Sequence, residues 1–373
     1  MWAIKSMKKI DWYIIKKFLS TFFFSIFLFT VIAVVVDISE KADDFAKSGL
    51  SAGAIVTQYY FGFVPYILAL LFPLFIFIAV IFFTSKMAGR SEIVAILASG
   101  TAYNRWLRPY WMAGILLALI LLVANLYVVP KANVIRGNFE AKYLDPNSSY
   151  ETLTKSRNSS GSDFYMKVDS FTYAGIYNYD TISKRGGPIF LDEIRNNQMV
   201  KNTRAEGLSW DTLTKKWKLE YVIERNLLPL GENVRLLPAL YKNLNFTPID
   251  IRQDKYTKDK LTSPQLAHFI KLQELRGAEG LNELKVEAGR RYATPITVIL
   301  LTLIGAIVAG RKVRGGSGLH LAVGFVIAAL FIITDKFSTI FSTKGNLPPE
   351  IAPWIPNMFF LFVVFYLYRK APK

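Results

Sequence analysis

The sequence predicts an α-helical membrane protein with six transmembrane helices, three on each side of an inserted extracytoplasmic β-jelly-roll or β-sandwich domain. Of its 373 residues 52% are apolar, and the 28 Phe gather in long uncharged runs. These runs form two groups, and the segment between them contains no apolar run of membrane length. Basic residues are concentrated in the loops that would lie on one side of the membrane.

The first three predicted spans lie within residues 1–130. Residues 18–36 carry no charge and are long enough to cross about 30 Å of hydrocarbon. This run is too long for a cleavable signal peptide, and no small-residue cleavage site follows it. Residues 61–83 form the second span, in which Pro65 and Pro73 predict a kink. The third span covers residues 106–129, and we expect Pro130 to end it.

The middle segment, residues 131–262, predicts the outer β domain because apolar and polar residues alternate along it. Phe164, Met166 and Val168 follow this alternation. Between residues 217 and 224 the polar side chains are expected on the solvent face. The side chains expected on the buried face of that strand are Trp217, Leu219, Tyr221 and Ile223.

A periplasmic helical linker is predicted at residues 263–291, where Ser263 and Pro264 open a short polar helix that runs to Arg276. The remaining three spans lie within residues 292–373, at 293–309, 319–337 and 353–368. An even number of spans places both termini on the same side of the membrane.

The net charge of +17 fits this topology and gives no support to a nucleic-acid partner. The segments assigned to the cytosol are rich in Lys and Arg, and their only acids are Asp11 and Glu92. Such an excess of inward cations sets the orientation of membrane helices. The basic composition therefore needs no nucleic acid to explain it.

The sequence offers no catalytic or metal site. It has no cysteine, and its two histidines, His268 and His320, lie far apart. The nearest approach to a phosphate-binding loop, Gly305 to Gly310, lacks the Ser or Thr that must follow the lysine. We therefore expect no enzymatic activity and no directly bound cofactor, and if the protein moves a substance uphill, a partner must supply the energy.

The loop at residues 86–100 predicts a short helix, with Ser91 as its N-cap and Gly100 closing it. Glu92 would be an isolated acid, and an apolar stripe would follow it. This helix either docks into a groove on a cytosolic partner or lies on the lipid headgroups. The candidate docking residues are Arg90, Ser91, Glu92, Ile93, Ile96 and Leu97.

Charged residues at the outer ends of two spans form a second candidate site. Asp37 and Lys41 follow the first span, and Asp335 and Lys336 end the fifth. They are either interfacial anchors or a gate at which cations contact an anionic lipid headgroup. For Asp335 a local salt bridge or a helix-end role is favoured over a proton relay.

Several local sequences resemble one known family. The opening Ile10–Ile14 segment, the Ser91-Glu92-Ile93 and Ala98-Ser99-Gly100 sequences, and Asp335 resemble motifs of the LptF/LptG (YjgP/YjgQ) permeases, with Asp335 pointing to an LptG-like member. The resemblance covers nearly the whole chain and is strongest over residues 10–110 and 290–370. The middle domain matches in placement and type but not in motif.

This resemblance implies the permease subunit of an ABC transporter in the bacterial inner membrane, with both termini cytosolic and the β domain periplasmic. Such a subunit extracts lipopolysaccharide or a related glycolipid. It pairs with a second permease, and a cytosolic LptB-like ATPase binds the Glu92 helix and uses the ATP. Lipid would enter between the first and fifth helices, and LptC/LptA-like bridge proteins would receive it.

The resemblance also implies that Lys41 lies near the lipid phosphates. A further lysine that family members carry in the first span is absent here, where Val34 or a neighbour stands. Two other functions stay open. One is a different exporter permease with a single large outer loop after the first span, which the three-plus-three division disfavours. The other is a membrane-anchored sensor or assembly factor whose β domain binds an envelope ligand.

Overall fold

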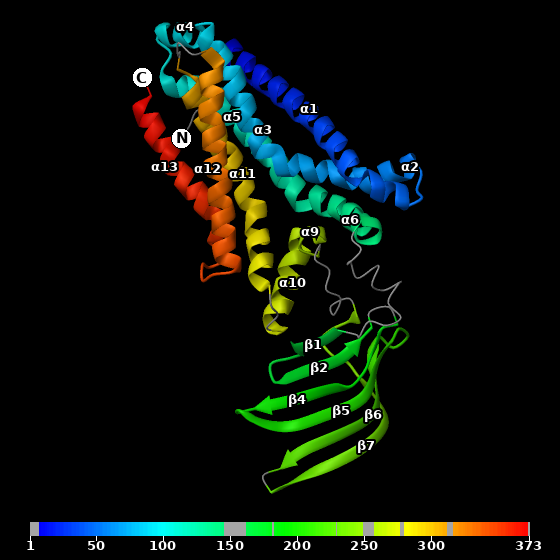
Figure 1. The fold of residues 1–373 in the computed structure, drawn as a ribbon. Coiled ribbons are helices and arrows are strands. Elements are labelled where there is room, and N and C mark those ends of the chain that lie inside the picture. The colour runs from blue at the N-terminus through cyan, green and yellow to red at the C-terminus, as the bar shows by residue number, and fades with distance from the viewer. Residues whose placement is uncertain are drawn as a thin grey trace. The chain divides into compact units, whose positions relative to one another are not determined.

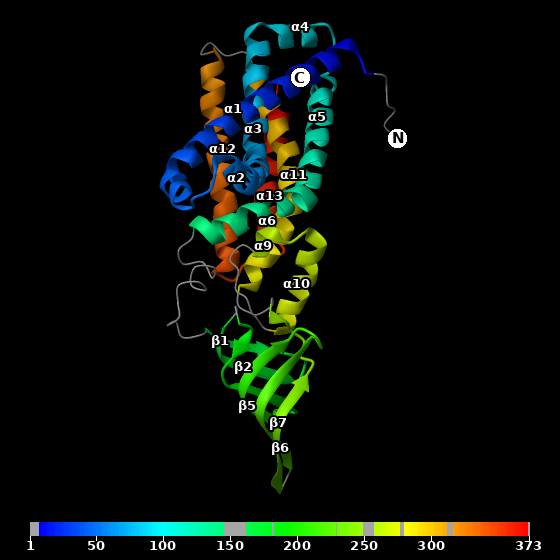
Figure 2. The same ribbon diagram turned by 90° about the vertical axis from the view of Figure 1, so that its right-hand side faces the viewer.

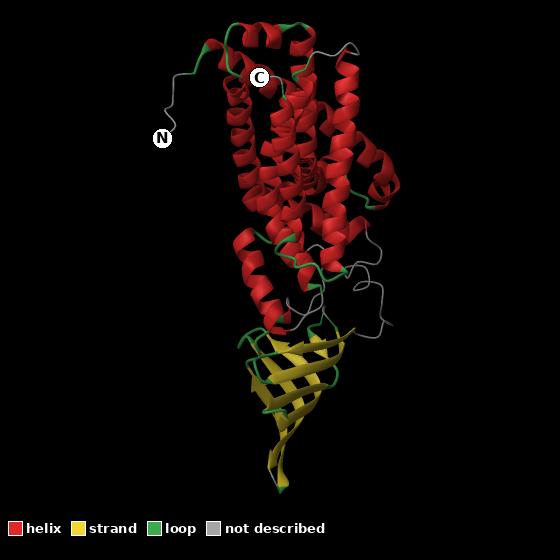
Figure 3. Ribbon diagram, turned by 90° about the vertical axis from the view of Figure 1, so that its left-hand side faces the viewer, coloured by secondary structure: helices red, strands yellow, loops and turns green. Residues whose placement is uncertain are grey.

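A computed structural model describes residues 7–144, 162–180, 183–228, 230–248, 257–276, 280–311 and 316–371. The chain divides into two compact units. The first is helical and comprises Met1–Gly137, Lys258–Leu266 and Asn282–Lys373. The second contains the strands and comprises Asn138–Thr257 and Ala267–Leu281. Figure 3 distinguishes the helices from the strands.

Three long helical stretches contain the first three predicted spans (Figure 1). The first is α1, Lys9–Lys47, a single uninterrupted helix. The second combines α2 (Ala52–Ile55), the π-helical segment η1 (Val56–Tyr60) and α3 (Phe61–Gly89), with Pro65 and Pro73 inside α3. After the short α4, Glu92–Ala98, the third begins with α5, Tyr103–Val123.

The prediction that Pro130 ends the third span is wrong. The helix continues from α5 through the π-helical η2 (Ala124–Val128), α6 (Val129–Phe139) and the π-helical η3 (Glu140–Leu144). Pro130 is the second residue of α6, directly after η2. Inside a helix, a proline lacks the N–H for one i→i−4 hydrogen bond and crowds the carbonyl one turn earlier, and a wider π-helical turn changes the hydrogen-bond pattern at that point. The π-helical segment before it therefore lets the chain continue as one long helix.

The second half contains α9 (Thr257–Lys260), α10 (Ser263–Arg276), α11 (Leu281–Ala309), α12 (Gly316–Thr343), the 3₁₀ turn η4 (Ala352–Trp354) and α13 (Ile355–Lys370). The predicted linker helix beginning at Ser263 is present. Among the described residues, five helical stretches are long and apolar enough to cross a membrane. The sixth predicted span falls on α13, whose 16 residues are fewer than the roughly 20 that a span requires, so the structure does not confirm it.

Burial differs sharply between the candidate spans. In α11, 72% of the most apolar window is buried inside the chain, whereas the corresponding shares are 11% in α1 and 17% in α12. The interior cluster beside α1 includes Phe18, Phe22 and Tyr110. Because α1 and α12 are peripheral, their outward apolar residues, such as Phe24 and Phe27, contact whatever surrounds the chain.

Arg291 joins the linker to the start of α11. Its guanidinium donates to the carbonyls of Lys258 and Leu261, at 2.9 and 2.8 Å, and to the Ser263 hydroxyl at 3.2 Å. The Arg291 residue is only 4% exposed. Burial raises the pKa of nearby Asp259, against the opposing effect of Lys258. The turn between α9 and α10 is therefore held on the N-terminal part of α11.

The strands form one antiparallel sheet with the order β1-β2-β4-β5-β6-β7, and β3 pairs with β5. This confirms a β domain between the two groups of helices, but the described residues show neither a jelly roll nor a second packed sheet. Its buried face contains Ile176, Leu191, Leu208 and Trp217. The bounds are β1 Ser162–Lys167, β2 Thr172–Tyr179, β3 Arg185–Gly186, β4 Ile189–Arg195, β5 Gln198–Asp211, β6 Lys216–Leu228 and β7 Gly231–Lys242.

The expected alternation in β6 holds as far as Leu219 and then reverses. Tyr221 has a φ of 52°, in the left-handed region, and is 69% exposed instead of buried. The next residue, Val222, is buried in its place. Glu224 is also buried and forms an ion pair with Lys201 at 2.8 Å. An irregular residue in a strand exchanges the two faces beyond it, which strict alternation cannot foresee.

Candidate functional site

The predicted docking helix exists as α4, and it lies at the same end of the helical unit as the start of α1 and the end of α13 (Figures 1 and 2). Ser91 occupies its N-cap position, as predicted, but with a φ of 61° and without a side-chain capping hydrogen bond. The expected Ser91 cap is therefore absent. The residue instead provides the left-handed turn by which the chain leaves α3.

The apolar stripe of α4 faces the chain's own core. Ile93 is 1% exposed, and Ile96 and Leu97 are partly buried against the same cluster. The exposed residues of α4 are instead Val94, which is 52% exposed, Ala95 and Ala98. Ile93, Ile96 and Leu97 thus anchor α4, and of these three residues only Ile93 is fully buried.

Glu92 is not an isolated carboxylate, contrary to the sequence-based expectation. The Tyr13 hydroxyl of α1 donates a hydrogen bond to its Oε2 at 3.1 Å. An Arg90 nitrogen lies 3.9 Å from the other oxygen. The Glu92 side chain stays 28% exposed. One oxygen of Glu92 thus connects α4 to α1, while the side chain remains accessible to a partner.

A second polar contact holds the start of α1. Asp11 accepts two hydrogen bonds from the Arg105 guanidinium of α5, both at 2.6 Å, and a third from the Lys8 backbone N–H at 2.8 Å. The Asp11 side chain is 6% exposed. This paired geometry is among the strongest that a carboxylate and a guanidinium can form. The N-terminal end of α1 is therefore fastened to both helices that flank the 99–102 turn.

The outer predicted pair, Asp37 and Lys41, lies in a compact polar cluster. Lys41 Nζ is 2.5 Å from Asp37 Oδ1. The Tyr59 hydroxyl donates to the same oxygen at 3.1 Å, and the Tyr60 hydroxyl donates to Oδ2 at 3.0 Å. Lys41 also donates to the Tyr59 hydroxyl and lies 5.5 Å from the centre of the Phe63 ring. The cluster fastens α1 to η1.

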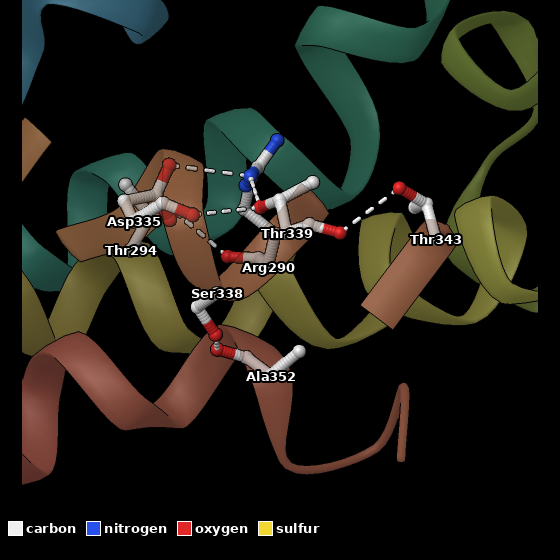
Figure 4. A network of polar contacts seen from close by, with 7 residues as sticks. All are labelled: Arg290, Thr294, Asp335, Ser338, Thr339, Thr343 and Ala352. Atoms are coloured by element: carbon white, nitrogen blue, oxygen red, sulfur yellow. Dashed lines mark hydrogen bonds and ion pairs between the residues drawn. The ribbon is translucent and has the colours of Figure 1, made fainter. Parts of the chain in front are cut away.

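The other predicted pair is held by different partners. Arg290 of α11 donates to Asp335 at 3.2 Å and to the Thr339 hydroxyl at 2.7 Å, as Figure 4 shows. Asp335 therefore makes the local salt bridge that the sequence favoured, and it joins α11 to α12. Lys336, the neighbouring cation, is exposed.

A shallow apolar groove lies near this second pair. It has a volume of about 670 Å³ and is lined by Ile333, Phe337 and Phe341 of α12, together with Leu347 and Pro348 of the following loop. Its lining is overwhelmingly apolar, so it suits hydrocarbon better than a polar solute.

The family model described as "Lipopolysaccharide export system permease LptF/LptG" matches residues 12–370. The chain belongs to the LptF/LptG family. It is similar to the lipopolysaccharide export system permease protein LptG of Escherichia coli strain K12, with 21% identity over 370 residues, which cover 97% of this chain and 98% of that protein. The LptG protein of Escherichia coli O6:H1 gives the same values.

Membership of the LptF/LptG family and the long apolar helices identify a multi-pass membrane permease. Sequence analysis located the α4 segment and the charges at the ends of the spans, but it missed their partners Tyr13, Tyr59, Tyr60 and Arg290. Asp11 and Tyr13 both stand in the opening segment that resembles the family motif, which is a signal that was available. The two adjacent tyrosines after the first outer loop gave no comparable sign.

Proposed function

We propose that this chain is a transmembrane permease subunit of an ABC transporter that extracts lipopolysaccharide, or a related glycolipid, from the inner membrane and passes it to a periplasmic bridge. A separate LptB-like ATPase would supply the energy. The observation that carries this proposal is the geometry of α4. It is anchored by Ile93, fastened to α1 through Glu92, and open to a partner along Val94 and Ala98.

The lipid path would run beside α1 and α12. These are the least buried candidate spans, and their exposed faces are rich in Phe, Leu and Ile. A lipid with several acyl chains crosses most easily when its chains remain in an apolar environment throughout. A second LptF/LptG-type permease facing α1 and α12 would complete such a passage, and the groove beside Phe337 would add surface for an acyl chain.

The topology follows from the same proposal. α13, together with η4, would be the sixth span, which places both termini in the cytosol and the sheet unit in the periplasm. There the sheet would deliver the lipid to LptC/LptA-like bridge proteins. We propose in addition that the domain is a jelly roll, because a continuous bridge would require domains of similar fold in contact.

Replacement of Glu92 by Lys tests the role of α4. The change reverses the acid that α4 presents at its exposed start and removes the acceptor for Tyr13. We expect the variant to insert normally but to lose ATPase association or ATP-driven lipid release. The measurement is co-purification of the ATPase with the full chain, followed by lipid release from proteoliposomes that contain the whole transporter.

Glu40→Lys is the matched control, because it makes the same charge change at an exposed site at the other end of α1. This control should retain the ATPase, which separates a local loss at α4 from a general effect of the charge change. Wild-type transport by the Glu92→Lys protein would remove the coupling role of α4 from the proposal.

A further inference from the structure

The direction of the Glu92 side chain is set from outside α4. Ser91, with its φ of 61°, determines where α4 begins, and the burial of Ile93 holds the helix against the core. Neither contact orients Glu92, whose side chain is long and flexible. The Tyr13 hydroxyl of α1 does so by donating to Glu92 Oε2 at 3.1 Å. The carboxylate is therefore oriented by a residue that lies 79 positions earlier in the chain.

The contact with Tyr13 holds Glu92 without neutralising it. A hydroxyl donor carries no net charge, so the carboxylate keeps its negative charge while one oxygen is held. The neighbouring cation is engaged only loosely, because an Arg90 nitrogen lies 3.9 Å from Oε1 and the Arg90 side chain is 59% exposed. Such an exposed ion pair contributes little and exchanges easily. Oε1 thus remains available to a partner with stronger donors.

Tyr13 stands on a well-fixed part of α1. The Asp11 carboxylate and the Arg105 guanidinium fasten this turn of α1 to α5 through two hydrogen bonds of 2.6 Å. Lys17, one turn further along α1, lies 5.7 Å from the centre of the Tyr13 ring. Partial burial, followed by the Glu92 carboxylate, raises the pKa of Tyr13, so the hydroxyl is protonated at neutral pH and can donate.

We propose that Tyr13 is a positioning residue for the partner ATPase: by holding Oε2 of Glu92, it presents Oε1 to the ATPase. The group that meets Oε1 is a cation or an N–H donor, because a carboxylate oxygen only accepts hydrogen bonds. This inference rests on the proposed function, which brings the ATPase to α4. It adds to the docking site a residue of α1, which acts through Glu92.

Tyr13→Phe tests this role, because it removes the hydroxyl and keeps the ring that Lys17 contacts. Nanodiscs that contain the whole transporter without its ATPase are titrated with the purified, fluorescently labelled ATPase. We expect the half-saturating ATPase concentration to rise by about two- to tenfold, as for the loss of one hydrogen bond. Lipid release at saturating ATPase should keep the wild-type rate, because excess ATPase compensates for a smaller fraction of correctly oriented Glu92.

The Glu92→Ala background separates positioning from a structural role. Without a carboxylate to orient, adding Tyr13→Phe should change the half-saturating concentration by less than about twofold. A structural role for Tyr13 would give the same loss in both backgrounds, or would lower lipid release even at saturating ATPase.

Tyr366→Phe is the matched control. Tyr366 is 57% exposed near the end of α13, and Lys370 lies 5.0 Å from the centre of its ring, as Lys17 does beside Tyr13. Its hydroxyl makes no hydrogen bond within the part of the chain that the structure describes. This variant should bind the ATPase as the wild type does.

Weaker binding by Tyr13→Phe that disappears in the Glu92→Ala background supports the positioning role. Wild-type binding by Tyr13→Phe overturns it, as does an equal loss in both backgrounds or a lower release rate at saturating ATPase. If Tyr13→Phe binds normally while Glu92→Lys loses the ATPase, only the role of Tyr13 falls and the proposed function stands. Wild-type binding by both Glu92→Ala and Glu92→Lys would remove the coupling role of α4, and the role of Tyr13 with it.

Discussion

At the scale of single residues, the Asp11–Arg105 pair should decide how firmly the inner end of α1 is held. In the Asp11→Asn variant, the two donating nitrogens of the Arg105 guanidinium face a side-chain amide in which only the oxygen can accept a hydrogen bond. We expect the free energy of unfolding to fall by about 1–3 kcal/mol, because Asp11 is largely buried while Arg105 is partly exposed. Thermal unfolding of the detergent-solubilised full chain measures this change.

The conservative variant Arg105→Lys keeps the charge but loses the two-pronged geometry, so it should give a smaller loss of stability. Arg90→Lys makes the same change at a side chain that is 59% exposed and should have little effect. Equal stability of the Asp11→Asn, Arg90→Lys and wild-type proteins would show that the pair does not hold α1.

The sequence reached some of these residues and missed others for a physical reason. Asp37, Lys41, Glu92 and Asp335 stand out because a charge at the end of an apolar run is visible from composition alone. Their partners, such as Tyr13 and Tyr59, are amphipathic and common at membrane interfaces, so nothing in their spacing separates a ligand from an anchor. Only the fold brings residues 13 and 92 together.

At the scale of elements, substitutions on the two faces of α4 should differ in their effects on stability and on ATPase binding. Val94→Asp changes an exposed residue and should alter stability by no more than about 0.5 kcal/mol while weakening ATPase binding. Ile93→Asp places a charge in the interior cluster and should cost about 3 kcal/mol or more. Thermal unfolding and ATPase co-purification, measured on the same preparations, distinguish the two effects.

Ala98→Asp repeats the outward change one turn along α4 and should match Val94→Asp. A loss of stability with Val94→Asp, together with tolerance of Ile93→Asp, would contradict the orientation of the helix. Strong ATPase binding by both outward variants would instead show that the partner docks elsewhere.

The limits of pattern analysis at this scale are clear from two elements. Long uncharged runs located the main helices because crossing a bilayer imposes both length and composition. The local rules gave wrong predictions at Pro130 and Tyr221. The helix continues through the proline after a π-helical segment, and one residue of positive φ exchanges the faces of β6. Both outcomes depend on packing that no local sequence window contains.

At the scale of the whole molecule, the contacts of α1 connect its two ends to different parts of the chain. Asp11 and Tyr13 fasten its N-terminal end to α5 and α4, and Asp37 fastens its C-terminal end to η1. Between these contacts Phe18 and Phe22 pack against α5 and α3, while most of the apolar surface of α1 faces away from the chain. An unbroken helix that is held at both ends can pass a displacement of α4 to the cluster at its other end, which would link the site of the proposed ATPase to that of the proposed lipid entry.

This arrangement requires α4 and the sheet unit to lie on opposite sides of the membrane, and that requirement is testable. Because the native chain lacks cysteine, single cysteines report accessibility without background. Leu213→Cys lies in an exposed turn of the sheet unit, and Ser99→Cys follows α4. In intact spheroplasts, a membrane-impermeant maleimide should label Leu213→Cys at once and should label Ser99→Cys only after permeabilisation. Protection of Leu213→Cys in intact cells would place the sheet in the cytosol, and the lipid path could then not operate as proposed.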